Sequence, residues 1–446
     1  FFSDGPDVSL LLCGGMLDRS RQDVQYLVDH GVPALINEML LRLLEVKPRQ
    51  AVPFLCDLLS KQQLRASSTS VQALNDFLRC KEAHLRHKPV FVMGNESADL
   101  DSMVSAIAYA FLEYQDHHLH TVPVINIPRH EFVFRAEALW LFESLGMSHD
   151  CLTFIDEIDL ARFCNDRAAE LFLVDHNKLC PRQEHLASMV CGAVDHHVDE
   201  HLYTNTCTRR RVIHPSGSAC TLVAEAFFEP SCGATLPAAL AKMLLATILV
   251  DTMDLDPAKL KVTPRDVVAA EKLLGVVAGD DTTAQRAARA ALFDTLQKEK
   301  YNTARLSVQD SLRKDYKAYK FGPYPVGIAS VLDNIHDLVA KDPANFSSVC
   351  DSFCTQNQIL GLIIMCAYFV EREFRREIVV IQAGSDEAGS FYQKLVGSLE
   401  AQADLDLKPM NRKVWPATAV NGSCYSQGNT AFSRKKLSPL LEKCFQ

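Results

Sequence analysis

The chain has 446 residues, 48% of them hydrophobic, and a formal net charge of −9, which is enough length and apolar material for two or three domains. The acidic balance argues against a protein that coats nucleic acid, because such proteins need a basic surface. The 15 cysteines are odd in number and lack C-x-x-C pairs, which argues against a closed disulfide framework and favours a reducing, cytoplasmic location. The sequence lacks an apolar run of about 18 residues, so we expect no membrane span.

Residues 20–62 contain the first predicted elements. The stretch YLVDHGVPALINEMLLRLLEVKPRQAVPFLCDLL places apolar residues at helical spacing, and Pro48 divides it into two helices. Two helices this apolar cannot bury their own faces, so they should either pair with a second copy or pack as a cap on the rest of the chain. The residues alone leave both arrangements open.

The same stretch resembles the dimerisation/docking domain of the regulatory subunits of cAMP-dependent protein kinase, which has a similar Gly-(Ile/Val)-Pro step. The resemblance implies a homodimer whose helices present a groove to the amphipathic helix of an anchoring protein. A linker or further helix is expected over residues 63–88.

From Pro89 onward, short apolar runs alternate with helical patterns. The runs PVFVMG, VPVINI, CLTFI, ELFLVDH and CGAVDHH are separated by stretches such as SMVSAIAYAFLEY and EFVFRAEALWLFESLG. This alternation predicts an α/β domain with a mostly parallel sheet over residues 89–275. A charged linker helix is expected over 276–304, followed by a second α/β domain over 305–446 with strands in VGIASVL, ILGLIIMCAYFV and REIVVIQAG. Two such domains would flank a cleft.

Acidic side chains stand where four apolar runs of the first domain end, and we interpret all four runs as strands. A strand-terminal Asp is more often the N-cap of the next helix, but ligands of parallel sheets bind at the carboxyl edge, so four motifs together favour a site. The residues are Asn95, Asp99 and Asp101 after PVFVMG, Asp175 in ELFLVDH, Asp195, His196 and His197 in CGAVDHH, and Asp251 at the end of LLATILVD.

Carboxylates crowded at one edge repel each other unless cations neutralise them. Carboxylate, amide and imidazole donors suit Mg²⁺, Mn²⁺ or Co²⁺ better than a thiolate site does. Two such ions roughly 3.5–4 Å apart, sharing a carboxylate, activate a water and clamp a phosphoryl group. The acidic motifs therefore predict hydrolysis of phosphoesters or phosphoanhydrides.

The segments GNESADLDS, LVDHN, VDHHVDE and ILVDT, in this order, resemble the motifs of the DHH/DHHA2 phosphoesterases. Within that family, their residues most resemble those of exopolyphosphatases of the yeast and trypanosomatid type and of the related prune proteins. The resemblance covers residues 89–446 and implies two divalent ions, Mg²⁺ first, with Mn²⁺ or Co²⁺ as alternatives. The implied roles are Asp99 and Asp101 each on one ion, Asp175 bridging both, His196 and Asp251 completing the second ion's ligands, His197 facing the phosphate, and Asp195 orienting the histidines.

Asn95 departs from the family pattern, because manganese pyrophosphatases of the family carry a histidine there. An amide oxygen in place of an imidazole, or no direct ligand at all, should favour Mg²⁺ over softer ions. The departure therefore favours polyphosphate over pyrophosphate as the substrate.

The resemblance also implies cations for the substrate in the last domain. FSRKKLSPLL resembles the family's S-R-K-K signature, so Arg434 and Lys435 are implied to grip phosphates, and Lys317 in KDYKAYKFG is a weaker candidate. On charge alone, a solvated basic turn explains the first segment equally well. His117, His118 and His120, in DHHLH, are expected to be solvent-exposed and not to bind metal.

The sequence thus predicts an exopolyphosphatase that releases orthophosphate from inorganic polyphosphate through a metal-activated water. A pyrophosphatase or a nucleotide phosphodiesterase of the same family, cyclic nucleotides included, is an alternative, and so is a non-catalytic docking scaffold. Every expected carboxylate is present in the sequence, which favours the enzyme.

Overall fold

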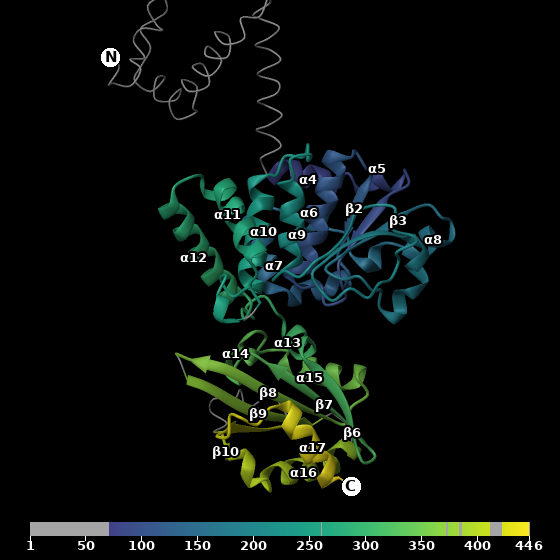
Figure 1. Cartoon of the computed structure of the whole chain (residues 1–446). Helices are drawn as coiled ribbons and strands as arrows, with labels where there is room; N and C mark the ends of the chain where they lie inside the picture. The colour runs from purple at the N-terminus through teal and green to yellow at the C-terminus, as the bar shows by residue number, and fades with distance from the viewer. Residues whose placement is uncertain (1–70, 260, 372, 383–385, 411–421, 446) are drawn as a thin grey trace, which may run out of the picture.

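The computed structural model describes residues 71–259, 261–371, 373–382, 386–410 and 422–445. The predicted helical pair at 20–62 lies outside these residues, so the dimerisation/docking segment stays a prediction. The described chain forms two α/β domains, drawn one above the other in Figure 1. Among the described helices, none combines the length and apolarity that a membrane crossing requires.

The first domain contains the parallel sheet that the sequence predicts, with strand order β2-β1-β3-β4-β5. The run CLTFI contributes a single bridge, Ile125 with Phe154, in place of the predicted strand, and the short β5 was not predicted. The strands are β1 (Val90–Met93), β2 (Thr121–Val124), β3 (Glu170–Val174), β4 (Val190–Asp195) and β5 (Arg211–Ile213).

Alternating side chains of these strands enter two different cores. Val90 and Val92 of β1 pack into the larger core beneath the long central helix α6, whereas Phe91 and Met93 pack into the core on the opposite face. Strands buried on both faces read as continuous apolar runs, which is why the runs were recognisable in the sequence.

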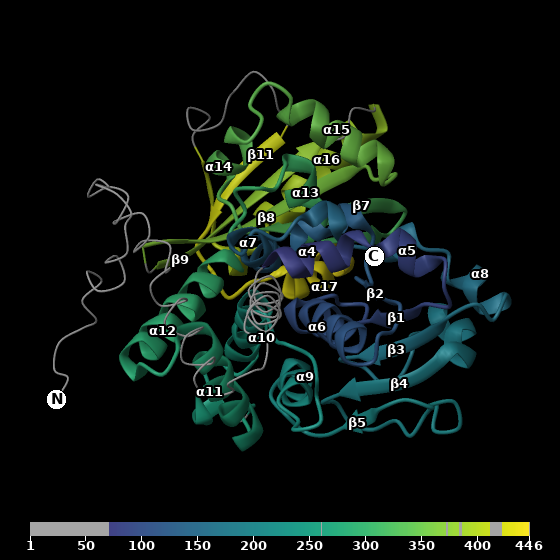
Figure 2. The same cartoon turned by 90° about the horizontal axis from the view of Figure 1, so that it is seen from above.

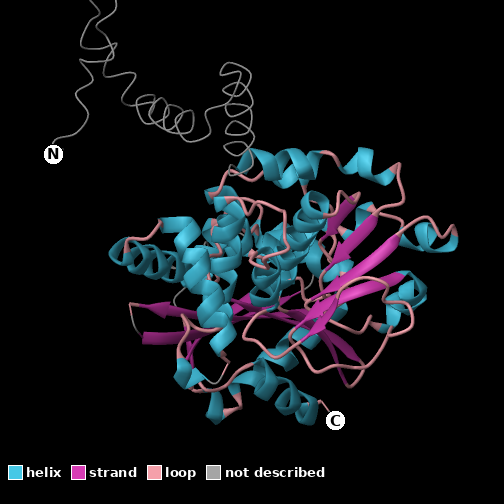
Figure 3. Cartoon of the chain, turned by 45° about the horizontal axis from the view of Figure 1, so that its top comes forward, coloured by secondary structure: helices cyan, strands magenta, loops and turns pink. Residues whose placement is uncertain are grey.

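The helices of the first domain lie on both sides of its sheet (Figure 3). The predicted helix EFVFRAEALWLFESLG is split into the 3-10 segment η2 and the helix α7, and α12, at the position expected for a linker helix, packs against α7, α10 and α11. The helices are α4 (Val71–Arg79), α5 (Lys81–Leu85), α6 (Leu100–Asp116), α7 (Ala136–Ser144), α8 (Leu160–Asn165), α9 (Ala219–Phe227), α10 (Ala238–Asp251), α11 (Pro264–Ala278) and α12 (Thr282–Glu299). The 3-10 segments of the described chain are η2 (Arg129–Phe134), η3 (His149–Cys151), η4 (Ile155–Glu157), η5 (Pro181–Met189), η6 (Pro257–Lys259) and η7 (Ala403–Leu405).

The second domain is a six-stranded mixed sheet with strand order β10-β11-β9-β8-β7-β6. The pair β7–β8 is parallel and the other pairs are antiparallel. The strands are β6 (Tyr316–Phe321), β7 (Tyr324–Val331), β8 (Gly361–Val370), β9 (Glu373–Gln382), β10 (Leu407–Pro409) and β11 (Gly422–Gln427). The helices are α13 (Val308–Lys314), α14 (Ile335–Ala340), α15 (Phe346–Gln356), α16 (Asp386–Glu400) and α17 (Arg434–Cys444).

Each domain has hydrophobic cores of its own. Among the described residues, the core clusters of the first domain end at Leu296 and those of the second begin at Val308. The domains touch where α13 meets η2 and through Arg305, whose guanidinium pairs with the Glu143 carboxylate of α7 at 2.5 Å. Figure 2 shows both domains from above.

Candidate active site

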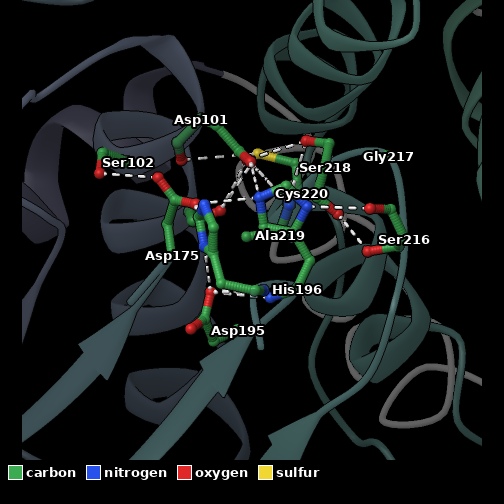
Figure 4. A network of polar contacts seen from close by, with 12 residues as sticks. Asp101, Ser102, Asp175, Asp195, His196, Ser216, Gly217, Ser218, Ala219 and Cys220 are labelled. Carbon is green, nitrogen blue, oxygen red and sulfur yellow. Dashed lines mark hydrogen bonds and ion pairs between the residues drawn. The ribbon is translucent and has the colours of Figure 1, made fainter. Parts of the chain in front are cut away.

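Three of the four acidic motifs meet at the carboxyl ends of neighbouring strands. Asp175 directly follows β3, Asp195 ends β4, and Asn95 lies two residues beyond the end of β1. Strands β1, β3 and β4 are adjacent in the sheet. The sheet order therefore brings together the side chains that the sequence grouped by motif, as Figure 4 shows for Asp175 and Asp195.

The fourth motif reaches the site from a helix, because Asp251 is the last residue of α10. Our interpretation of LLATILVD as a strand was therefore wrong. Helix α10 is packed against α6, α9, α11 and α12, so nearly every side of it is apolar and the helical period that would have identified it is lost. Asp251 Oδ2 is buried and has no hydrogen-bond partner among the described residues.

Asp99 and Asp101 both act at helix N-termini. Asp99 is the N-cap of α6 and accepts a hydrogen bond from the Ser102 backbone N–H at 3.1 Å. Asp101 accepts hydrogen bonds from the Ser218 hydroxyl at 2.8 Å and from the backbone N–H groups of Ala219 at 2.7 Å and Cys220 at 2.8 Å. These two N–H groups open α9 and have no partner within their own helix, so the buried Asp101 carboxylate stabilises the start of α9.

Asp175 is held through both of its carboxylate oxygens. Its Oδ2 accepts hydrogen bonds from Asn95 Nδ2 at 2.8 Å and from the Ser102 hydroxyl at 2.9 Å, and its Oδ1 lies 3.3 Å from His196 Nε2. Its φ is +58°, a left-handed conformation that non-glycine residues adopt mainly at turns and functional sites. Burial and the Asp101 charge raise the pKa of Asp175 to about 7.

Asp195 holds the two histidines that follow it. The side chain is fully buried, and its Oδ1 accepts hydrogen bonds from the backbone N–H groups of His196 at 2.8 Å and His197 at 3.2 Å. The same oxygen lies 2.8 Å from His197 Nδ1, and Oδ2 accepts from Asn177 Nδ2 at 2.5 Å. Burial raises the pKa of Asp195, but the hydrogen bonds from His197 and Asn177 outweigh it and leave the pKa lowered. Asn177 was missed in the sequence, although it ends the segment LVDHN.

His196 is oriented from both ends of its ring. Its Nδ1 lies 2.9 Å from the Ser216 carbonyl oxygen, to which it donates, so Nε2 faces Asp175. Burial lowers the pKa of His196, but the hydrogen bond to Asp175 and the charge of Asp101 raise it to about 10. The Ser216 carbonyl thus fixes the ring with Nε2 toward Asp175, and an ion bound beside Asp175 would take the place of the proton that the raised pKa keeps on Nε2.

The site is short of positive charge and fits a divalent cation. Donor atoms of Asp175, His196 and His197 lie within 4.8 Å of one another. Burial and the neighbouring carboxylate of Asp101 raise the pKa of both Asp99 and Asp251. A bound cation would relieve this repulsion, and the unpartnered Asp251 oxygen could coordinate it.

A hollow of about 380 Å³ opens beside Asn95 and is also lined by Ser97, Asn126, His176 and Gln183. His176, adjacent to Asp175, donates its Nδ1–H to the Val174 carbonyl at 2.9 Å, and its buried Nε2 has no hydrogen-bond partner among the described residues. His176 therefore faces the neighbourhood of the site and not the outer surface.

The candidate substrate cations lie in the second domain. Arg434 is the first residue of α17, its side chain is 10% exposed, and its Nη2 lies 2.5 Å from Asp315 Oδ1 while its Nη1 donates to the Asp315 carbonyl. Lys435 and Lys317 are exposed. The ion pair and hydrogen bond that Arg434 makes with Asp315 lie within the second domain. Its approach to the carboxylates of the first domain therefore stays a prediction. Asp315 was missed, although it lies two residues before Lys317 in KDYK.

Comparisons with known proteins agree with the motifs. The DHH family N-terminal domain matches residues 89–248, and the DHHA2 domain matches residues 294–444. "Exopolyphosphatase PRUNE1" of Mus musculus is 29% identical over 375 residues, covering 83% of this chain and 79% of that protein. "Putative exopolyphosphatase" of Schizosaccharomyces pombe is 32% identical over 374 residues, covering 79% of this chain and 89% of that protein.

A "Probable manganese-dependent inorganic pyrophosphatase" of Lactobacillus acidophilus is 23% identical over 309 residues, covering 68% of this chain and 88% of that protein. Taken with the order of its two domains and the geometry of its carboxylates, these matches show that the chain belongs to the DHH/DHHA2 phosphoesterase family.

Proposed function

We propose that this protein is a metal-dependent exopolyphosphatase that releases orthophosphate from the ends of inorganic polyphosphate. The observation that carries the proposal is the buried cluster of carboxylates, with the unpartnered Asp251 oxygen, at the carboxyl edge of the first sheet. Two similar proteins, from mouse and fission yeast, bear the name exopolyphosphatase, which supports polyphosphate as the substrate.

The residues that would hold two divalent cations, Mg²⁺ first, are Asp99, Asp101, Asp175, His196 and Asp251. When bound, such cations neutralise charge on phosphoryl oxygens and provide a water of lowered pKa as the nucleophile.

The chain's own groups then bind and orient the substrate. His197 is 57% exposed while Asp195 holds its Nδ1, which leaves its Nε2 directed away from Asp195 and available to a phosphate oxygen. Arg434, Lys435 and Lys317 would bind further phosphates from the second domain, Arg434 through the fork of its guanidinium. Catalysis of this kind consists mainly of positioning and charge stabilisation.

The contacts of Asn95 support polyphosphate over pyrophosphate. Its amide nitrogen donates to the Asp175 carboxylate at 2.8 Å, and its Oδ1 accepts from the Ser97 hydroxyl at 2.6 Å. Both ends of the amide are engaged in orienting the site, so Asn95 supports a ligand and does not replace the histidine ligand implied for the manganese pyrophosphatases.

The proposal is tested with Mg²⁺ by phosphate release from long-chain polyphosphate, tripolyphosphate and pyrophosphate, and by formation of AMP from cyclic AMP. We expect release from polyphosphate by the wild type and background rates from Asp175→Asn, which removes the central carboxylate charge. Asp159→Asn is the matched control, because Asp159 caps α8 outside the site. Absence of product from every substrate would refute the enzyme, and hydrolysis of pyrophosphate or cyclic AMP alone would refute the substrate.

A further inference from the structure

Three histidines meet at the amino ends of β1 and β2, on the opposite edge of the sheet from the carboxylates. His84 lies in α5, His87 follows that helix, and His120 directly precedes β2. The Val90 N–H donates to the His120 carbonyl at 2.8 Å, which fixes His120 beside the start of β1. Helix α5 packs against β2, as Figure 1 shows near the top of the first domain.

The side chains of His84 and His120 are already at a chelating distance. Their Nδ1 atoms lie 3.2 Å apart. Two nitrogens bound to one tetrahedral zinc ion at about 2.0–2.1 Å are themselves about 3.3 Å apart. A hydrogen bond between the rings fits the same distance, but it would require one Nδ1 to carry a proton.

The surroundings of His84 favour a neutral ring over a positively charged one. His84 is 4% exposed, and its Nε2, which carries the proton of the neutral ring when Nδ1 binds an ion, has no hydrogen-bond partner among the described residues. Burial, then the neighbouring His120 and His87, lower the pKa of His84. A neutral imidazole is the ligand that Zn²⁺, Cu²⁺ and Ni²⁺ prefer, whereas Mg²⁺ prefers oxygen.

A third imidazole and room for a small ligand are at hand. The ring of the exposed His87 stacks on His120 with centroids 4.4 Å apart, and His87 would change its rotamer to bind the same ion as the pair. A hollow of about 310 Å³, lined by Tyr114, Gln115, His118, Leu119, His120 and Gly233, opens beside His120. An ion can therefore enter from solvent and keep a water as its fourth ligand.

We propose that His84, His120 and His87 form a second metal site, which binds Zn²⁺ or a similar borderline divalent ion. The bound ion would fasten α5 to the start of β2. The site differs from the candidate active site in donor type and in its edge of the sheet, and it revises the expectation that His120 does not bind metal.

The test is a titration of the metal-free full chain with Zn²⁺ in competition with a chromophoric chelator. We expect His120→Gln to lose one equivalent of bound Zn²⁺, and His87→Gln to keep that equivalent with an affinity at least about ten-fold weaker. His336→Gln should match the wild type, because this exposed histidine of α14 lies in the other domain. Both tested histidines are exposed, so their variants should fold.

Asp175→Asn distinguishes zinc bound at the carboxylates from zinc bound at the histidines. This variant should retain the equivalent of bound Zn²⁺ that His120→Gln loses. His120→Gln should also keep the wild-type rate of Mg²⁺-dependent phosphate release, so the outcome is independent of the proposed enzyme activity. Unchanged stoichiometry and affinity in His120→Gln would overturn the proposal and leave His84 and His120 as a hydrogen-bonded pair.

Discussion

Asn95 is an uncharged residue among carboxylates and imidazoles, and its side chain contacts the central carboxylate, Asp175. Its amide donates to both the carboxylate and the carbonyl of Asp175, at 2.8 and 3.2 Å. The residue therefore orients Asp175, whose backbone is already in a left-handed conformation. At the scale of single residues, the choice of metal and substrate should depend on this contact.

Asn95→His should shift the preferred ion from Mg²⁺ toward Mn²⁺ and raise hydrolysis of pyrophosphate relative to tripolyphosphate, because it would add an imidazole nitrogen, a softer ligand, where Asn95 supplies none. The measurement is kcat/KM for both substrates with each ion. Asn95→Ala separates loss of the amide from gain of the imidazole. Identical behaviour of the His and Ala variants would contradict the prediction.

Removal of the metals should make stability depend on pH through Asp175. Its pKa is about 7 in the folded protein, against 3.8 for an ordinary aspartate, so the folded state binds more protons than the unfolded state between these values. The contribution of Asp175 to the unfolding free energy is thus greatest below pH 3.8 and falls as the pH rises through 7.

Urea unfolding of the metal-free protein from pH 5 to 8 measures this effect. The unfolding free energy of the wild type should decline relative to that of Asp175→Asn as the pH rises, and saturating Mg²⁺ should abolish the decline. A constant difference between the two proteins without metal would show that the carboxylates do not repel one another as the structure indicates.

At the scale of elements, the sequence predicted the central strands and the polar and acidic residues that follow them, because β1, β3 and β4 are buried on both faces and read as apolar runs. The edge strands β5, β6 and β10 were missed, and so was β11, which lies next to β10. They are short or carry polar and exposed residues, so neither an apolar run nor a clear alternation marks them.

Contacts across elements could not be predicted at all from local pattern. Asp101, which caps α9, accepts a hydrogen bond from Ser218, 117 positions away in the sequence. Asp251 reaches the site from a helix whose apolar run resembles a strand. The pairing of Asp315 with Arg434 likewise spans 119 positions. Motif resemblance identified Asp101, Asp251 and Arg434 individually, but their partners follow only from the fold.

Asp315 joins the entry of β6 to the first turn of α17, and its removal should loosen Arg434. Asp315→Asn should raise KM for polyphosphate several-fold and leave metal affinity unchanged, because the carboxylate and carbonyl of Asp315 hold both terminal nitrogens of Arg434. Steady-state kinetics check this, with Asp310→Asn on the nearby α13 as the control. A lowered KM would instead mean that Asp315 competes with the substrate for Arg434.

At the scale of the whole molecule, two domains with separate cores are joined by few polar contacts. The Glu143 and Arg305 side chains are 42% and 41% exposed, so their pairing is worth less than about 1 kcal/mol of stability. Its importance lies in linking α7 of the first domain to the segment that leads into the second. Such a link can be broken at little cost when the domains move.

Glu143→Gln should therefore reduce the unfolding free energy only slightly at neutral pH, and the difference should disappear in acid. The hydrogen bond from Arg305 lowers the pKa of Glu143, so its contribution is present above the ordinary glutamate pKa and is lost as the pH falls through the lowered value. Denaturation of both proteins across this range is the measurement. A difference that persists after Glu143 is protonated would refute the role of its charge.

The separate cores also determine the order in which a growing chain acquires its parts. All carboxylates of the site precede residue 252, and the first domain's cores use no described residue beyond Leu296, so a nascent chain can fold this domain and capture metal while the second is still being synthesised. Arg434 and Lys435 are synthesised after all of these residues. On the proposed function, ribosome-bound protein would hold its ions before the residues proposed to bind a phosphate chain have been made.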